Sequence, residues 1–101
     1  ASGKVVHVAQ GALKTAGARE VDCTGLHIYP GMIEAGTVLG LVEVDSLRET
    51  NDSRDGGDFQ PDLRASIGIN PDSELIPVAR ANGVTTAFTR PTGGLIPGQG
   101  A

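Results

Sequence analysis

The sequence predicts an α/β fold, and three observations lead to this prediction. Short segments rich in β-branched residues and bounded by glycine occupy most of residues 1–44. Residues 73–82 carry apolar side chains at helical spacing, and Asn82-Gly83 supplies a helix stop. Residues 84–89 follow at once and have strong β propensity. A helix, a glycine and a strand in succession are typical of an α/β unit.

In the first part of the chain we expect strands at residues 4–9, 19–23 and 26–29, the last one ended by the turn dipeptide Pro30-Gly31. A longer apolar run at residues 37–44 shows continuous rather than alternating hydrophobicity. Because continuous hydrophobicity is expected of a strand that is buried on both faces, a further strand is predicted there.

In the second part, residues 61–67 are expected to form a short helix with Pro61 at its first position. A longer helix is predicted at residues 73–82, where Pro77 falls in the first turn. The apolar face of this helix consists of Leu75, Val78 and Ala79, and its candidate N-caps are Asn70, Asp72 and Ser73. The glycine-rich residues 92–101 have no period and are expected to form a flexible loop.

Acidic residues are concentrated in the middle of the chain. The formal net charge is −4, and residues 43–62 hold seven of the twelve acidic residues but only two basic ones, Arg48 and Arg54. Residues 49–58 include no apolar residue. A segment of this composition buries too little surface to offset the entropy of ordering. We therefore predict a mobile loop at about residues 46–60, which divides the chain in two.

Composition excludes several classes of protein. The eight Lys and Arg residues are scattered, so no basic surface for nucleic acid is expected. No apolar run approaches the ~18 residues of a membrane-spanning helix, and no signal peptide is recognisable. The single cysteine, Cys23, excludes an intrachain disulfide and a cysteine-rich zinc site. We expect a soluble protein of the cytoplasm or periplasm that binds neither nucleic acid nor membrane.

Isolated reactive side chains give little indication of a site. His7 and His27 lie far apart, each between aliphatic residues, and are expected on the surface of strands rather than as metal ligands. Cys23 stands beside Asp22 and lacks a neighbouring base, so an inert thiol is expected.

Two segments have the composition of known binding motifs, but neither has the required residues at the required spacing. Residues 93–100 have the glycine content of a phosphate loop, but Gln99 stands where a lysine must follow Gly98. Residues 43–62 are acidic but lack the pattern of a calcium-binding EF-hand loop. A loop after a strand and a solvated loop, respectively, are expected.

Two other segments resemble the amidohydrolase superfamily, in particular its imidazolonepropionase-like members. In that family the pattern D-x-x-G-x-x-x-x-P-G-x-I-D leads from a small β-sandwich into the first strand of a metal-dependent TIM barrel. Residues 21–40 resemble this pattern, with Glu34 in place of the final aspartate. Residues 82–86 resemble the family's G-V-T-T strand, which follows a barrel helix. The matching positions of the first pattern are Asp22, Gly25, Pro30, Gly31 and Ile33.

The family's metal-binding motif is replaced in this chain. In the family His-x-His comes next, and its imidazoles hold a divalent metal such as zinc, which activates water. Here Gly36 and Val38 stand at those positions, flanked by the family-like Thr37, Leu39 and Gly40. Glycine and valine offer a metal no side-chain lone pair. The resemblance therefore implies no catalytic, cofactor-binding or metal-binding residue in this chain.

Alternation along a strand is expected to place Glu34, Gly36 and Val38 on one face. Glu34 is then the sole plausible donor, and one carboxylate cannot hold a transition metal tightly. No zinc, iron or nickel is expected at these positions.

The resemblance also implies a domain organisation. It assigns residues 1–34 to the end of a small β-sandwich and residues 35–101 to the first βα units of a TIM-type barrel. Because a complete barrel takes about 200–250 residues, the chain is expected to be an N-terminal fragment. Its expected partners are the rest of its own parent chain and further copies that pair through open sheet edges.

Three functions stay open on the sequence. The favoured one is the N-terminal part of a hydrolase that acts on non-peptide C–N bonds of a small cyclic amide or related molecule, with the isolated chain inactive. The second is a degenerate, non-catalytic family member that serves as a binding or scaffold protein. The third uses no resemblance and is a small α+β interaction module.

Overall fold

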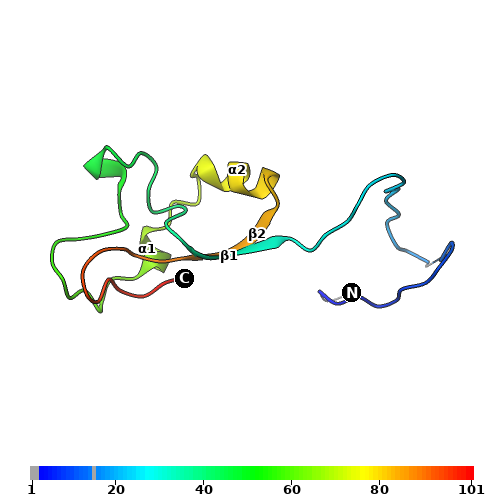
Figure 1. The fold of residues 1–101 in the computed structure, drawn as a ribbon, viewed down its shortest axis with the longest axis horizontal. Coiled ribbons are helices and arrows are strands. Elements are labelled where there is room, and N and C mark those ends of the chain that lie inside the picture. The colour runs from blue at the N-terminus through cyan, green and yellow to red at the C-terminus, as the bar shows by residue number, and fades with distance from the viewer. Residues whose placement is uncertain (1–2, 15) are drawn as a thin grey trace.

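The computed structural model describes residues 3–14 and 16–101. Two parallel strands, β1 (Met32–Thr37) and β2 (Val84–Thr89), form its sheet. Between them the chain forms a 3-10 turn, η1 (Arg48–Thr50), and two short helices, α1 (Ala65–Gly68) and α2 (Leu75–Ala81) (Figure 1). Parallel strands need such a crossover because the chain must return to the starting edge before it can pair again. The mixture of helix and strand agrees with the predicted α/β class.

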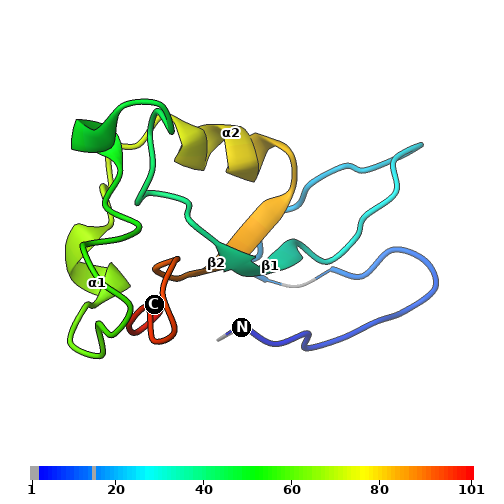
Figure 2. The same ribbon diagram turned by 60° about the vertical axis from the view of Figure 1, so that its left-hand side comes forward.

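The register of the sheet brings the ends of both strands together. Met32 pairs with Val84 at one end and Thr37 pairs with Thr89 at the other, with register shifts between them. Beyond the second pair, the Arg90 N–H donates to the Thr37 carbonyl over 2.9 Å. The segments that follow β1 and β2 therefore start at the same edge of the sheet, while α2 packs on β2 (Figure 2).

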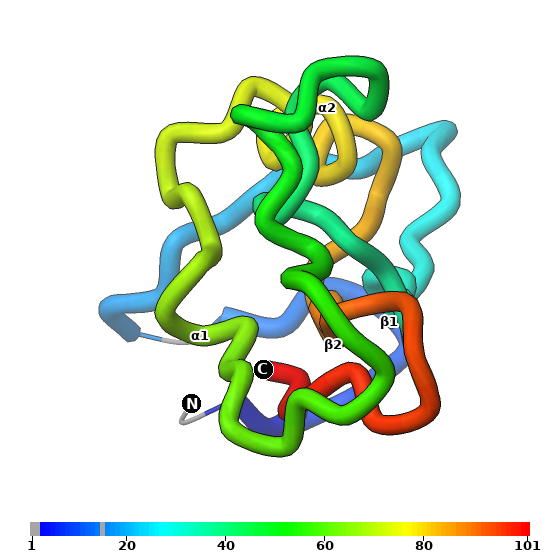
Figure 3. The backbone as a smooth tube through the Cα atoms, turned by 90° about the vertical axis from the view of Figure 1, so that its left-hand side faces the viewer, coloured from blue at the N-terminus to red at the C-terminus, as the bar shows by residue number. Residues whose placement is uncertain are grey.

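The small core lies beyond this edge rather than on the sheet. Leu41 is 1% exposed and Ala65 is 2% exposed. Pro91 is also fully buried, and Leu41 packs close to Gly68 at the end of α1. Viewed along the long axis, the C-terminal segment curls beside α1 (Figure 3). The residues that follow the two strands thus converge with α1 into one packed region.

The strands expected at residues 4–9, 19–23 and 26–29 are not formed, and these predictions are wrong. Residues 3–14 and 16–31 carry no strand or helix and extend away from the sheet (Figure 1). The valines of the first segment are 77–84% exposed. A strand is stabilised by a hydrogen-bonded partner and a buried face, and the described residues offer these segments neither. The assignment of residues 1–34 to a β-sandwich stays a prediction.

The strand expected at residues 37–44 is also wrong, because β1 ends where that segment begins. The chain turns at once: the Leu41 and Val42 N–H groups both donate to the Val38 carbonyl, and Gly40 has a φ of +79°. The continuous hydrophobicity of this run reflects a buried turn that carries Leu41, since a buried turn and a buried strand need the same apolar residues.

The later elements agree better with their predictions. β2 coincides with the predicted strand, and α2 lies within the predicted residues 73–82. Gly83 ends the helix with a φ of +92°, which favours glycine. The helix expected at residues 61–67 is shorter and later, as α1, and Pro61 lies in a turn before it. Among the described residues, no helix has the length and apolar character to cross a membrane.

Candidate functional site at the strand ends

The carboxyl ends of β1 and β2 bring two charged side chains to one glycine. A Cβ built on Gly36 would lie 3.3 Å from Arg90 Nε. The Gly36 N–H donates to Glu34 Oε1 over 3.3 Å. Both charged residues are exposed. The Glu34 carboxylate from β1 thus bonds to Gly36, and the Arg90 guanidinium, one residue beyond β2, lies beside the same glycine.

Val38 does not share this arrangement, so the expectation that residues 34, 36 and 38 alternate onto one face is wrong. β1 ends at Thr37, and the register shifts between Glu34 and Thr37. Val38 belongs to the following turn, where its carbonyl accepts two backbone hydrogen bonds. Strict alternation requires a regular strand, and the strand is neither long nor regular enough.

The residues present at this edge do not fit a transition metal. Gly36 and Val38 offer no donor, and the nearest side-chain nitrogen to Gly36 belongs to a guanidinium, which has no lone pair to give and carries a positive charge. Glu34 supplies one carboxylate, whereas a catalytic zinc takes three protein ligands. Nowhere in the described chain do three His, Cys, Asp or Glu residues gather in a manner that suits a metal ion.

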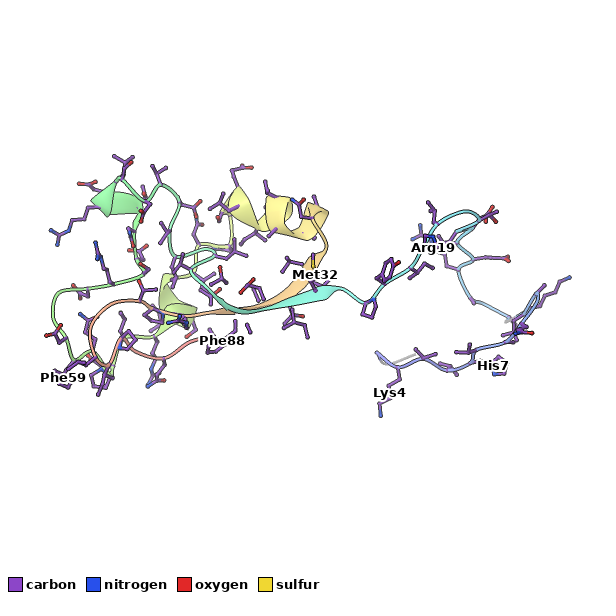
Figure 4. The ribbon with its side chains drawn as sticks, in the orientation of Figure 1. Lys4, His7, Arg19, Met32, Phe59 and Phe88 are labelled. Carbon is purple, nitrogen blue, oxygen red and sulfur yellow. The ribbon has the colours of Figure 1, made fainter. Side chains whose placement is uncertain are left out.

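The two histidines and the cysteine lie on the N-terminal extension, away from this edge. Figure 4 shows His7 far from the labelled Phe88 of β2. His7 is exposed, and His27 is exposed with its ring centroid 6.4 Å from that of Tyr29. Cys23 is free and partly buried. The structure brings none of the three to the strand ends.

Asp22, the first residue of the family-like pattern, closes a local turn. Its Oδ1 accepts hydrogen bonds from the Thr24 hydroxyl (2.6 Å) and the Thr24 N–H (2.9 Å). The hydroxyl bond, followed by the backbone bond, lowers the pKa of the Asp22 carboxyl below its ordinary value, because both bonds favour the ionised form. The side chain is fully exposed, so this turn is a local structure rather than a part of a site.

The C-terminal residues pack against the rest of the chain, while the flexibility expected of residues 92–101 stays a prediction. Residues 92–101 have no regular secondary structure, but their backbone pairs with residues 58–65 through bridges at Phe59–Ile96 and Arg64–Gln99. Thr89 and Ala101 exchange two hydrogen bonds of 2.8 and 2.7 Å. Gly94 and Gly98 allow this close approach of two backbones, because a Cβ at either position would lie 2.8 or 2.5 Å from the carbonyl oxygen of Asp58 or Leu63, respectively.

The polar segment at residues 46–60 makes contacts at its centre. The Asp52 N–H donates to the Leu41 carbonyl and the Thr92 N–H donates to the Ser53 carbonyl, both over 2.7 Å. Ser53 is 4% exposed, and its hydroxyl bonds to Asn51. These contacts attach residues 51–53 to the core, while the mobility of the segment stays a prediction.

A cleft of about 930 Å³ opens between this polar segment and α1. Pro91, which follows Arg90, forms part of its wall. Within the described chain, the three arginines on its lining form no ion pair with the four aspartates there. The charged residues of the lining are Asp45, Arg48, Asp52, Arg54, Asp55, Asp62 and Arg64.

Two features of the site were missed from the sequence. Arg90 was not singled out, although a charged residue directly after a predicted parallel strand is a usable signal. The Glu43 carboxylate accepts hydrogen bonds from the Ser73 hydroxyl (2.9 Å) and the Asn70 amide (3.3 Å), and so ties the chain before α2 to the turn after β1. Nothing in the local sequence points to that contact.

Comparison with known proteins points to part of an amidohydrolase. No protein-family model and no curated protein matches the chain. A crystal structure described as an amidohydrolase from Thermotoga maritima MSB8 matches all of this chain with a TM-score of 0.89 and 30% sequence identity. This chain spans 27% of the length of that protein's chain. The structure of the described residues therefore resembles one part of that amidohydrolase chain.

Proposed function

We propose that this chain is the N-terminal portion of an amidohydrolase-type hydrolase that acts on a non-peptide C–N bond of a small cyclic amide or related molecule. The observation that carries the proposal is the match to the Thermotoga maritima amidohydrolase over the whole of this chain. Exposed apolar side chains on the extension and on β1, such as Ile28 and Ile33 at 78% and 74% exposure, support it. They are surface that the remainder of a β-sandwich and of a barrel would cover.

The strand ends are the proposed location of the site. In barrel enzymes the active site lies at the carboxyl ends of the strands, on the loops that follow them. Hydrolysis of a cyclic amide adds the oxygen of water to the carbonyl carbon and a proton to the departing nitrogen, which opens the ring. Gly36 and Val38 supply no group that activates water. The groups that do so must come from other parts of the protein, and the isolated chain is expected to be inactive.

A second candidate is a degenerate family member that binds a ligand or a partner without metal chemistry. The observation that favours it is the Arg90 guanidinium beside Gly36, because a positive charge at that point opposes a divalent cation. The two candidates share one scaffold and differ only in whether bound ligand is hydrolysed.

One experiment separates them. The full-length protein is incubated with a panel of five- and six-membered cyclic amides, and ring opening is followed by mass spectrometry as the gain of one water. Calorimetry with the same panel measures binding. Ring opening supports the hydrolase, and binding without ring opening supports the scaffold. The 101-residue chain is the matched control and is expected to show no turnover. If the full-length protein shows no binding and no turnover with this panel, both candidates are contradicted.

A further inference from the structure

We propose that Arg90 supplies the positive charge at the strand ends where the related family places a metal, and that its guanidinium binds an oxyanion group of the ligand. This inference rests on the proposed function, which puts the ligand site at the carboxyl ends of β1 and β2. It adds the chemical class of the ligand, namely a molecule with a carboxylate or phosphate group.

The backbone fixes the starting point of the Arg90 side chain. The Arg90 N–H donates to the Thr37 carbonyl over 2.9 Å, which continues the pairing of the sheet one residue beyond β2. The next residue, Pro91, is fully buried and limits how the chain can move there. Arg90 is thereby held at the edge where both strands end.

Gly36 makes room for the side chain. Arg90 Nε lies 3.3 Å from the place where a Cβ of residue 36 would stand, which is closer than most real Cβ contacts. A side chain at position 36 would require the Arg90 side chain to shift by a few tenths of an ångström. The glycine at position 36 and the arginine at position 90 are therefore complementary, and the replacement of the metal ligand is matched by a cation across the sheet.

The Arg90 side chain is exposed. Among the described residues it makes no ion pair or hydrogen bond, although the Glu34 carboxylate contacts the same glycine. Arginine stays protonated at all physiological pH values, and its planar fork of N–H groups matches the two oxygens of a carboxylate or phosphate. Arg90 suits recognition of an oxyanion, because its backbone is hydrogen-bonded at the strand ends and its guanidinium has no partner among the described residues.

The test uses inorganic phosphate and acetate as probes on the full-length protein at constant ionic strength. The NMR signal of Arg90 Nε is expected to shift and saturate with at least one of them, and the two titrations show whether phosphate or carboxylate is preferred. In calorimetry, Arg90→Gln is expected to weaken binding of that anion by about tenfold or more. Arg90→Lys keeps the positive charge but lacks the planar fork of N–H groups. Its anion affinity is expected to lie between those of the wild type and Arg90→Gln.

The matched control is Arg80→Gln, which removes a positive charge from the last turn of α2 and is expected to leave anion affinity unchanged. An Arg90 signal that does not respond to either anion overturns the proposal, as does equal affinity in the wild type and Arg90→Gln. The NMR titration needs no variant, so it decides the matter even if Arg90→Gln fails to fold. Anion binding at Arg90 together with an absence of ring opening would reject the hydrolase and leave this inference standing.

Discussion

Two glycines of nearly identical φ differ in what surrounds them. Gly98 has a φ of +119° and Gly57 a φ of +115°, values that strain any other residue. A Cβ at Gly98 would lie 2.5 Å from the Leu63 carbonyl oxygen, whereas nothing lies within 4 Å of a Cβ at Gly57. A comparison of substitutions at these two glycines therefore distinguishes the cost of backbone strain, which both share, from the cost of close packing, which only Gly98 has.

We predict that Gly98→Ala lowers the free energy of unfolding by about 1–3 kcal/mol more than Gly57→Ala does. Both variants carry the cost of positive φ, but only the first pushes residues 92–101 off the backbone of residues 60–65. Chemical denaturation of the full-length protein measures both losses. Equal losses would show that the C-terminal segment is not packed as described.

At the level of single residues, the sequence alone identified Gly36 as a position of interest but did not identify Arg90. The position of Gly36 follows from the spacing of a family-like pattern, which is local. Arg90 lies beside Gly36 only because β1 and β2 pair in parallel, and this pairing joins residues that lie about 50 positions apart, as Thr37 and Thr89 do. A contact of that range depends on register, which no local pattern in this sequence specifies.

Elements with local signals were predictable. α2 begins after Ser73, whose hydroxyl accepts a hydrogen bond from the Leu75 N–H, and it ends at Gly83. β2 starts directly after that glycine. The strands expected before residue 30 share the composition of β2 but have no neighbour in the described structure. Strand propensity describes how well a side chain fits a pleated, half-buried surface, so it predicts a strand only where such a surface exists.

The polar segment at residues 46–60 allows a prediction at the level of an element. We expect slow hydrogen exchange at the Asp52 and Thr92 amides, which bond to backbone carbonyls beside the core, and fast exchange at Arg54 and Gly57, which donate no such bond. Amide exchange followed by NMR measures each site. Strong protection at Gly57 would contradict a mobile loop, and fast exchange at Asp52 would show that the central attachment does not persist.

The whole molecule is extended for its length. Its radius of gyration is 19.2 Å and its longest axis is 59 Å, whereas a compact chain of this size has a radius of gyration of ~13 Å. The described sheet has two strands, so each strand has an outer edge, and Ile33 of β1 is 74% exposed. Open edges with apolar side chains pair with other chains.

We therefore predict that the 101-residue chain self-associates at micromolar concentration, as measured by sedimentation velocity. Ile33→Lys places a charge on the outer face of β1 and is expected to shift the chain toward monomer. The matched control is Ile67→Lys in α1, which is 80% exposed but lies outside the sheet, and it is expected to have little effect. A compact, stable monomer of the unaltered chain would argue against both the open edges and the fragment interpretation.

The long crossover between β1 and β2 also determines how long β1 waits for its partner strand during synthesis. β1 leaves the ribosome about 50 residues before β2, which at 5–20 residues per second is a wait of roughly 3–10 s. Hydrophobic collapse and hairpin formation take microseconds, so the interval is long on the scale of folding. Throughout it, the apolar side chains of β1 have no native strand beside them. The order of the elements thus makes the nascent chain a natural client for chaperones until the segment that begins at Val84 emerges.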